Sequence, residues 1–301
     1  MIGGLYRLSQ KQGLGYSLRK LCHLFRVNRA WYYQRQNKVE KANPEEESLK
    51  QRVEQILGTY SGYGYRRVTK ALQKGGEKIN HKRVRRLLKK WGLSWKRWKR
   101  RKPLTSVNDP KAAREANRLV TAKQAGEINA PNRAWVGDVL FVATKKEEGY
   151  LATLLDGFSR KVVGWAVSRH NDTQLTLRAL QMAIGQRRPE AGLIHHTDKG
   201  SNYTSREYRE QLTAIGAVVS HSQPGRPQQN GMAESFNKTV SYEKLYLEEF
   251  QNLAEVAVGL EHWLERIYNE GRLHSSLGYL APVEFEHNWL AQKQLECGLV
   301  I

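Results

Sequence analysis

From about residue 131 onward, the sequence consists of short apolar runs of strand length followed by an alternation of helical and strand patterns. Three consecutive runs with Gly or Lys turns between them predict strands over 134–144, 150–155 and 162–168. Predicted helices and strands then alternate in the order helix 173–185, strand 193–196, helix 205–215 and strand 217–220. Hairpin-type strands followed by this alternation predict an α/β fold, in which helices cover a mixed sheet.

A polar loop over 221–230, with two prolines and a glycine, follows the last predicted strand. It leads into a long helix that starts near Gly231. A final helix is predicted around 254–268, because its apolar residues follow helical spacing. The predicted core therefore spans 131–290, and residues 291–301 are interpreted as a C-terminal tail.

Three acidic residues occupy unusual positions in this core. Asp138 lies inside the first strand, where a carboxylate is costly unless it is paired or binds a cation. Asp198 closes the run 193–197, and Glu234 is in the first turn of the helix after the loop. Adjacent strands would bring the aspartates together, and three carboxylates suit Mg²⁺ or Mn²⁺. Two such ions activate an attacking hydroxyl on a phosphodiester. A capping role is the alternative for acids at these positions.

The basic excess of the chain is confined to its first third. Residues 1–110 carry 28 Lys and Arg against seven Asp and Glu, whereas residues 111–301 carry 22 of each kind. A segment this basic lowers its free energy by meeting a polyanion and releasing counterions, so a nucleic acid is the predicted partner. A basic surface that serves solubility is less favoured, because the charge is both large and segregated.

Residues 1–40 are predicted to form a helix-turn-helix. Ser17 is the expected N-cap of a short helix, and its apolar residues follow helical spacing: Leu18, Leu21 and Phe25. Residues 27–29 are interpreted as a tight turn and 30–35 as the second helix. A plain helical hairpin fits this pattern equally well.

Residues 41–95 are predicted to form a second helical DNA-binding region. Asn43, Pro44 and the three acids after them mark a helix start, and the Gly-rich run 61–65 ends that helix. A second helix ends at Gly75-Gly76, and Asn80 caps a very basic third one with an apolar stripe. Such a helix suits a DNA groove better than calmodulin or a membrane surface. The predicted DNA contacts are Arg66, Arg67, Lys82, Arg83, Arg85, Arg86 and Lys89.

Residues 96–130 are predicted to be a basic linker. The run WKRWKRRK (95–102) combines positive charge with tryptophans that stack on bases or pack on the helices. The two cysteines are too few for a disulfide framework or a Cys-rich zinc site. No long apolar stretch or signal peptide is present, so no membrane partner is expected. The prediction is a cytoplasmic bacterial protein that is associated with the nucleoid when bound to DNA.

The spacing of the three acids resembles a known pattern. Fifty-nine residues separate Asp138 from Asp198, and 35 separate Asp198 from Glu234. This resembles the Asp-Asp-Glu core of retroviral integrases and the related insertion-sequence transposases. Five blocks are also similar to those of the family: WVGD (135–138), LLDGFSRKVVGWAVS (154–168), HTDKGSNY (196–203), GRPQQNGMAESFNKT (225–239) and YNEGRLHSSLGYLAPVEF (268–285). Upstream, GYGYRRV (62–68) and NHKRVRRLL (80–88) resemble the helical DNA-binding region of the second-frame protein of the insertion-sequence-three family.

This resemblance, which covers residues 17 to 290, implies an RNase H-like core and a DNA transposase. By position, Asp138, Asp198 and Glu234 are implied to be catalytic residues and ligands of two Mg²⁺ or Mn²⁺ ions. The implied reaction is 3′-end cleavage and strand transfer at terminal inverted repeats, without a covalent enzyme intermediate. The implied partners are double-stranded DNA of the element ends and the target, further copies of the chain on DNA, and an upstream-frame protein, often joined by frameshift fusion.

Several positions in the matching blocks have open roles. Asn230 and Ser235 flank the glutamate and either contact DNA or make turn and cap hydrogen bonds. His274 and Ser275 lie in the C-terminal block without an assigned role. Ser241 stands where many relatives have Lys or Arg, seven residues after the glutamate.

Lys238 is one helical turn after Glu234 and is the expected replacement as a DNA contact. Leu140 stands where relatives often have Thr.

Two other function classes compete with a transposase. A DNA-binding repressor or architectural protein with an inactive core would be favoured by Ser241, and an RNA–DNA hybrid nuclease is disfavoured by the basic helices.

Overall fold

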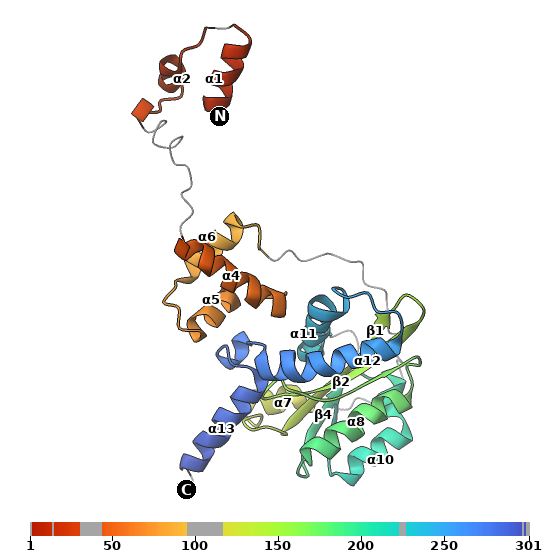
Figure 1. Ribbon diagram of the computed structural model, residues 1–301. Helices are drawn as coiled ribbons and strands as arrows, with labels where there is room; N and C mark the ends of the chain where they lie inside the picture. The colour runs from red at the N-terminus through yellow and green to blue at the C-terminus, as the bar shows by residue number, and fades with distance from the viewer. Residues whose placement is uncertain are drawn as a thin grey trace. The chain divides into compact units, whose positions relative to one another are not determined.

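The computed structural model describes residues 2–13, 15–30, 44–94, 117–222, 227–296 and 298. The chain divides into two units, Met1–Glu54 and Gln55–Ile301 (Figure 1). The first unit contains α1 (Ile2–Lys11), which the sequence did not predict, α2 (Leu18–Leu24) and most of α4 (Pro44–Thr59). The predicted cap of α2 is confirmed, because the Ser17 hydroxyl accepts a hydrogen bond from the backbone N–H of Lys20 at 3.2 Å. The cap Asn43, residues 31–35 and the run 95–102 lie outside the described residues.

The second unit begins with the end of α4 and continues through α5 (Tyr65–Lys74) and α6 (His81–Lys90). The predicted cap of α6 is confirmed, since the Asn80 side chain accepts a hydrogen bond from the N–H of Lys82 at 2.8 Å. The apolar stripe of α6 is buried at Val84, Leu87 and Leu88. Packing of this stripe leaves the basic residues of α6 exposed.

A five-stranded mixed sheet forms the centre of the second unit. Its strands are β1 (Ala134–Ala143), β2 (Glu148–Asp156), β3 (Val162–Ser168), β4 (Ile194–Thr197) and β5 (Val218–His221). Their order is β3-β2-β1-β4-β5; β1, β2 and β3 are antiparallel, whereas β4 and β5 run parallel to β1. This is the RNase H-like arrangement that the sequence predicts.

Helices cover both faces of the sheet. Figure 1 shows α8 (Thr173–Arg187) and α10 (Arg206–Ala214) on one side. The short α9 (Ser201–Thr204), which follows β4, contacts both of these helices. On the other side lie α11 (Gly231–Val240), which follows a 3₁₀ turn at Pro227–Asn230, and α12 (Leu253–His262). Neighbouring residues of one strand therefore enter different cores. Leu154 of β2 packs in the core with Leu180, and Leu155 packs in the core with Phe236.

Two helices lie where the sequence analysis placed irregular segments. The described part of the predicted linker contains α7 (Arg118–Gln124), whose Leu119 is buried with Ala134 and Val136 of β1. The backbone N–H of Leu119 also donates to the hydroxyl of Ser220 at 3.2 Å. The helix α13 (Pro282–Glu296) extends into the segment predicted as a C-terminal tail. No helix in the described ranges is long and apolar enough to cross a membrane.

Both α11 and α12 continue without a break into π-helical segments. These are η2 (Ser241–Leu245) and η3 (Trp263–Gly271), so the predicted helix around 254–268 extends further. A 3₁₀ turn, η4 (Ser275–Leu277), precedes α13. Asn269 fastens η3 to the edge strand β3, because its amide bonds both the N–H and the carbonyl of Val162, at 2.9 and 3.0 Å. π-Helical turns are rare and frequently occur at functional sites.

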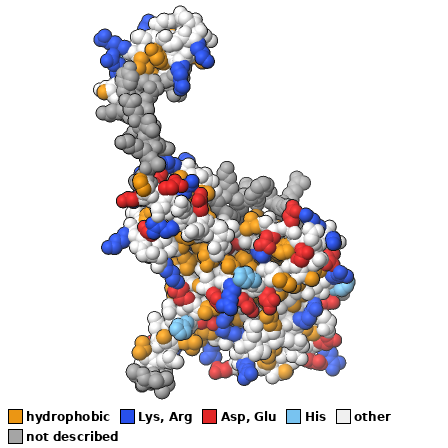
Figure 2. All heavy atoms as spheres, in the orientation of Figure 1, with side chains coloured by type: hydrophobic (Ala, Val, Ile, Leu, Met, Phe, Trp, Pro, Cys, Tyr) orange, Lys and Arg blue, Asp and Glu red, His pale blue; other side chains and the backbone are white. Residues whose placement is uncertain are grey.

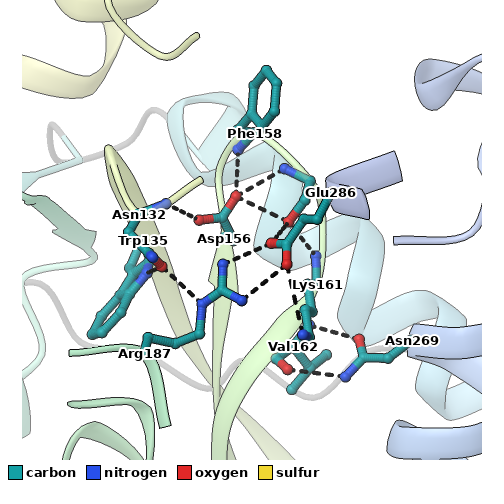
Figure 3. A network of polar contacts seen from close by, with 10 residues as sticks. Asn132, Trp135, Asp156, Phe158, Lys161, Val162, Arg187, Asn269 and Glu286 are labelled. Carbon is teal, nitrogen blue, oxygen red and sulfur yellow. Dashed lines mark hydrogen bonds and ion pairs between the residues drawn. The ribbon is translucent and has the colours of Figure 1, made fainter. Parts of the chain in front are cut away.

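A buried polar network attaches α13 to the sheet (Figure 3). Arg187, at the end of α8, makes two hydrogen bonds to Glu286 of α13, at 2.9 and 2.7 Å. Ser159 joins this pair to Asp156, since its hydroxyl lies 2.7 Å from Glu286 and 3.0 Å from Asp156. Burial raises the pKa of Asp156, and backbone N–H groups such as that of Asn132 oppose the shift. The network compensates charges that would otherwise be costly to bury.

Candidate active site

The register of two parallel strands brings Asp138 and Asp198 together. Trp135 of β1 lies opposite His195 of β4, and Val136 lies opposite His196. Continued by two residues along each chain, this register leads to Asp138 and to Asp198, which directly follows β4 and whose negative charge acts on Asp138. Because neighbouring strands are about 4.8 Å apart, this register places the two carboxylates side by side.

The third acid reaches the same place from α11. The side-chain amide of Asn230 donates to the carbonyl of Gly137 at 3.1 Å, and that of Asn237 donates to Oδ2 of Asp138 at 2.8 Å. Residues 230, 234 and 237 are four and three positions apart, so they share one helix face. Glu234 therefore lies on the face of α11 that is turned toward β1.

The charges of the three acids are coupled. Burial, followed by the negative charge of Asp198 and then that of Glu234, raises the pKa of Asp138 to about 7. The N–H of Val139 donates to Oδ1 of Asp138 at 3.0 Å and opposes this shift. The site therefore holds more negative charge than its protein surroundings compensate, which favours a bound cation.

The donor chemistry fits a hard divalent ion. All three side chains offer carboxylate oxygens, and the N–H of Gly200 fixes Asp198 by donating to its Oδ1 at 3.0 Å. The buried Oδ1 atoms of Asn230 and Asn237 have no hydrogen-bond partner among the residues that the structure describes. Glu234, however, pairs with Lys238 at 3.6 Å. Accordingly, no three His, Cys, Asp or Glu side chains in the described ranges are already arranged around a common metal position.

A second layer of polar residues under the site was not identified from the sequence. His196, fully buried, lies between the hydroxyls of Ser220 and Ser222, at 2.8 and 3.1 Å. Burial lowers its pKa to about 4, so the ring is neutral at pH 7. Asn237 was also missed, although its position three residues after Glu234 marks it as part of the same helix face. These groups orient the strand end and the helix that carry the acids.

The helix positions after Glu234 have distinct environments. Lys238 is half-buried beside Glu234. Ser241 is buried, and its hydroxyl donates to the carbonyl of Asn237 at 2.6 Å, so it does not face solvent. Ser235 is exposed.

Six of the seven predicted DNA contacts on α5 and α6 are exposed. Arg66 and Arg85 both lie 5.6 Å from the ring centroid of Tyr65, which links the two helices. Arg67 differs, because it is half-buried over the ring of Tyr63, at 5.7 Å. On the face shown in Figure 2, the large body carries interspersed acidic and basic side chains, as the charge balance of residues 111–301 predicts.

The RNase H-like sheet is the fold of a class of enzymes that cleave or transfer polynucleotide strands. Comparison with protein families agrees. Residues 128–227 and 216–282 each match an integrase core domain, and residues 44–102 match an HTH-like domain.

Full-length relatives identify the family. The chain is 36% identical to the transposase for insertion sequence element IS904 of Lactococcus lactis subsp. lactis (strain IL1403), over 82% of this chain and 96% of the relative. It is 29% identical to transposase InsF for insertion sequence IS3A of Escherichia coli (strain K12), over 95% and 99% of the two chains. The HTLV-2 integrase catalytic core domain in complex with magnesium (dimeric form) is 22% identical, with a TM-score of 0.40 over 52% of this chain and 98% of that chain. The protein belongs to the insertion-sequence-three family of DNA transposases.

Proposed function

We propose that Asp138, Asp198 and Glu234 hold two Mg²⁺ or Mn²⁺ ions and that the chain uses them to cleave 3′ ends of its element and join these ends to target DNA. The observation that carries this proposal is the β1–β4 register, which sets Asp138 beside Asp198 under the inward face of α11. When bound, such ions activate the attacking hydroxyl and stabilise the leaving oxygen of the phosphodiester.

The protein's own groups prepare the site. Asp138 loses its proton to become a ligand, while the Asn237 amide and the Val139 N–H hold its two oxygens in place. Glu234 gives up its ion pair with Lys238 and becomes part of the metal site. This pair is partly exposed, and solvent-accessible ion pairs contribute only about 1 kcal/mol or less, so this exchange costs little. Lys238 then becomes available for a DNA phosphate.

DNA is proposed to be held by the exposed basic residues of α5 and α6, namely Arg66, Lys82, Arg83, Arg85, Arg86 and Lys89. Such contacts make binding fall steeply with salt concentration. We further propose that several copies of the chain act together on the terminal inverted repeats, with or fused to an upstream-frame protein. Two measurements test whether the upstream-frame protein is required: co-purification of the chain with that protein, and binding of the repeat ends by the chain alone.

The catalytic assignment is tested by Asp138→Asn, Asp198→Asn and Glu234→Gln. Each is expected to abolish Mg²⁺-dependent joining of a labelled, pre-cleaved repeat end while leaving its Kd unchanged. Glu210→Gln is the matched control, because Glu210 is an exposed acid on α10 that pairs with Arg206. Strand transfer at the wild-type rate by any of the three variants would show that the assignment is wrong. End binding without strand transfer by the wild-type chain, in Mg²⁺ or Mn²⁺ and with the upstream-frame protein supplied, would overturn the proposed activity.

A further inference from the structure

Within the second unit, residues 271–284 contact α5 at its end and the loop just before it. The N–H of Leu273 donates to the hydroxyl of Tyr63 at 2.6 Å. At the other end of the contact, Lys74 of α5 forms an ion pair with Glu284 at 2.6 Å. The C-terminal sequence block, to which no chemical role was assigned, thus binds the helix that follows the GYGY motif.

A buried ion pair ties the same segment to the catalytic helix. Arg272 makes two hydrogen bonds to Glu243, at 2.7 and 2.6 Å, and the two side chains are only 3% and 8% exposed. Glu243 belongs to η2, the direct continuation of α11. A charge this deeply buried is strongly unfavourable without its partner, so each residue fixes the position of the other.

Two glycines allow the backbones to approach closely at this contact. A Cβ atom at Gly62 would overlap the carboxyl group of Glu243, and one at Gly271 would overlap the hydroxyl of Tyr60. The Glu243 carboxyl cannot move aside without breaking its pair with Arg272. The ring of Tyr60 is held in turn by stacking on Tyr63, with centroids 4.7 Å apart.

Aromatic packing continues from this contact to the acids. The ring of Tyr268 lies 5.8 Å from the guanidinium of Arg272 and 5.1 Å from the ring of His274. Its other side meets Phe236 of α11 edge-on, at 5.0 Å between centroids. Phe236 is two residues after Glu234. Packed side chains therefore connect Arg272, through Tyr268 and Phe236, to the turn of α11 that carries Glu234.

We propose that these contacts form a rigid joint that positions the catalytic helix relative to the DNA-binding helices α5 and α6, with Tyr63, Glu243 and Arg272 as its positioning residues. DNA bound to α5 and α6 is then held at a fixed offset from Glu234. The positioning role rests on the proposed function, because it concerns strand transfer at that site. It also accounts for the half-buried Arg67, which lies over Tyr63 at the joint.

The joint is tested in the full chain by Gly271→Ala and the double variant Gly271→Ala/Tyr60→Phe. The added methyl overlaps the Tyr60 hydroxyl; removal of that hydroxyl eliminates this overlap and leaves the ring carbon Cζ as the nearest atom, at 3.2 Å. Gly271→Ala is expected to slow single-turnover strand transfer, at saturating DNA, by about tenfold to a hundredfold, since small misplacements have effects of this size. The Kd for the repeat end stays unchanged, and Tyr60→Phe restores the rate.

Gly64→Ala is the matched control, because nothing lies within 4 Å of its added Cβ. A second readout does not depend on activity. A carbodiimide joins an amine to a carboxylate in direct contact, so it should cross-link Lys74 to Glu284 in the wild-type chain, as mapped by mass spectrometry, and not in Glu284→Gln. A wild-type rate in Gly271→Ala, or no rescue by Tyr60→Phe, would refute the joint.

The outcomes also separate the joint from the proposed function. Strand transfer by a wild-type chain that yields no Lys74–Glu284 cross-link would overturn the joint alone. A cross-linked wild-type chain that performs no strand transfer with the upstream-frame protein supplied would overturn the proposed function, and the positioning role with it.

Discussion

The buried charge of Asp138 should destabilise the metal-free protein at alkaline pH, and Asp138→Asn should relieve this. The pKa of Asp138 rises from 3.8 to about 7 on folding, because the carboxyl is buried and repelled by Asp198. The folded state therefore binds this proton more tightly than the unfolded chain. Stability is greatest below the unfolded pKa and is lost as pH rises toward the folded pKa. A shift of this size corresponds to roughly 4 kcal/mol above pH 7.

The assay is chemical unfolding in EDTA at pH 8 and pH 5, followed by tryptophan fluorescence. At pH 8, Asp138→Asn should be more stable than wild type by up to about 4 kcal/mol, and at pH 5 by less than half of that. The Asn237 amide, which donates to Oδ2 of Asp138, can turn over so that its Oδ1 accepts from an amide at position 138. Glu210→Gln should show no such pH-dependent gain. An Asp138→Asn variant that is less stable than wild type at pH 8 would refute the reasoning.

Two further predictions concern buried positions. Ser241→Lys should lower the free energy of unfolding by about 2 kcal/mol or more without improving DNA binding, because the new charge replaces a buried hydroxyl. Thermal melts measure the stability, and titrations with a repeat end measure the binding. Tighter binding at unchanged stability would contradict this prediction. Glu286→Ala should cost about 3 kcal/mol in urea unfolding, because it removes the carboxylate partner of Arg187, whose side chain is only 14% exposed. Glu296→Ala on the same helix, at a side chain that is 64% exposed, should be nearly neutral.

The strands and the placement of the acids follow from local signals. The predicted third strand has the bounds of β3, and Asp138, Asp198 and Glu234 lie in the strand, at the strand end and in the first helical turn where the sequence places them. Strand length, turn residues and caps are properties of a few neighbouring residues, so the sequence displays them directly. The roles of the three acids as metal ligands rest on the resemblance and stay predictions.

The joint had no such local signal. Tyr63 and Leu273 are 210 positions apart, and the Arg272–Glu243 pair links segments that each carry ordinary charged residues. Nothing near Arg67 distinguishes it from Arg66, yet one is half-buried and the other exposed. The helix α7 was missed for a related reason. It is only seven residues long, and its two buried side chains are recognisable as core residues only once they pack against β1 and β5. Long-range pairing selects among residues that are locally equivalent.

The contacts of the joint explain why position 241 carries a small serine. Ser241 opens the π-helical turn that carries Glu243 to Arg272, and its hydroxyl bonds the carbonyl of Asn237, whose amide holds Asp138. A long cation at this buried position would disrupt both connections. In the proposed mechanism the DNA-facing charge is that of Lys238, which forms an ion pair with Glu234. A phosphate that attracts Lys238 releases Glu234 at the same time, so DNA arrival and completion of the acidic site become one event in the proposed mechanism.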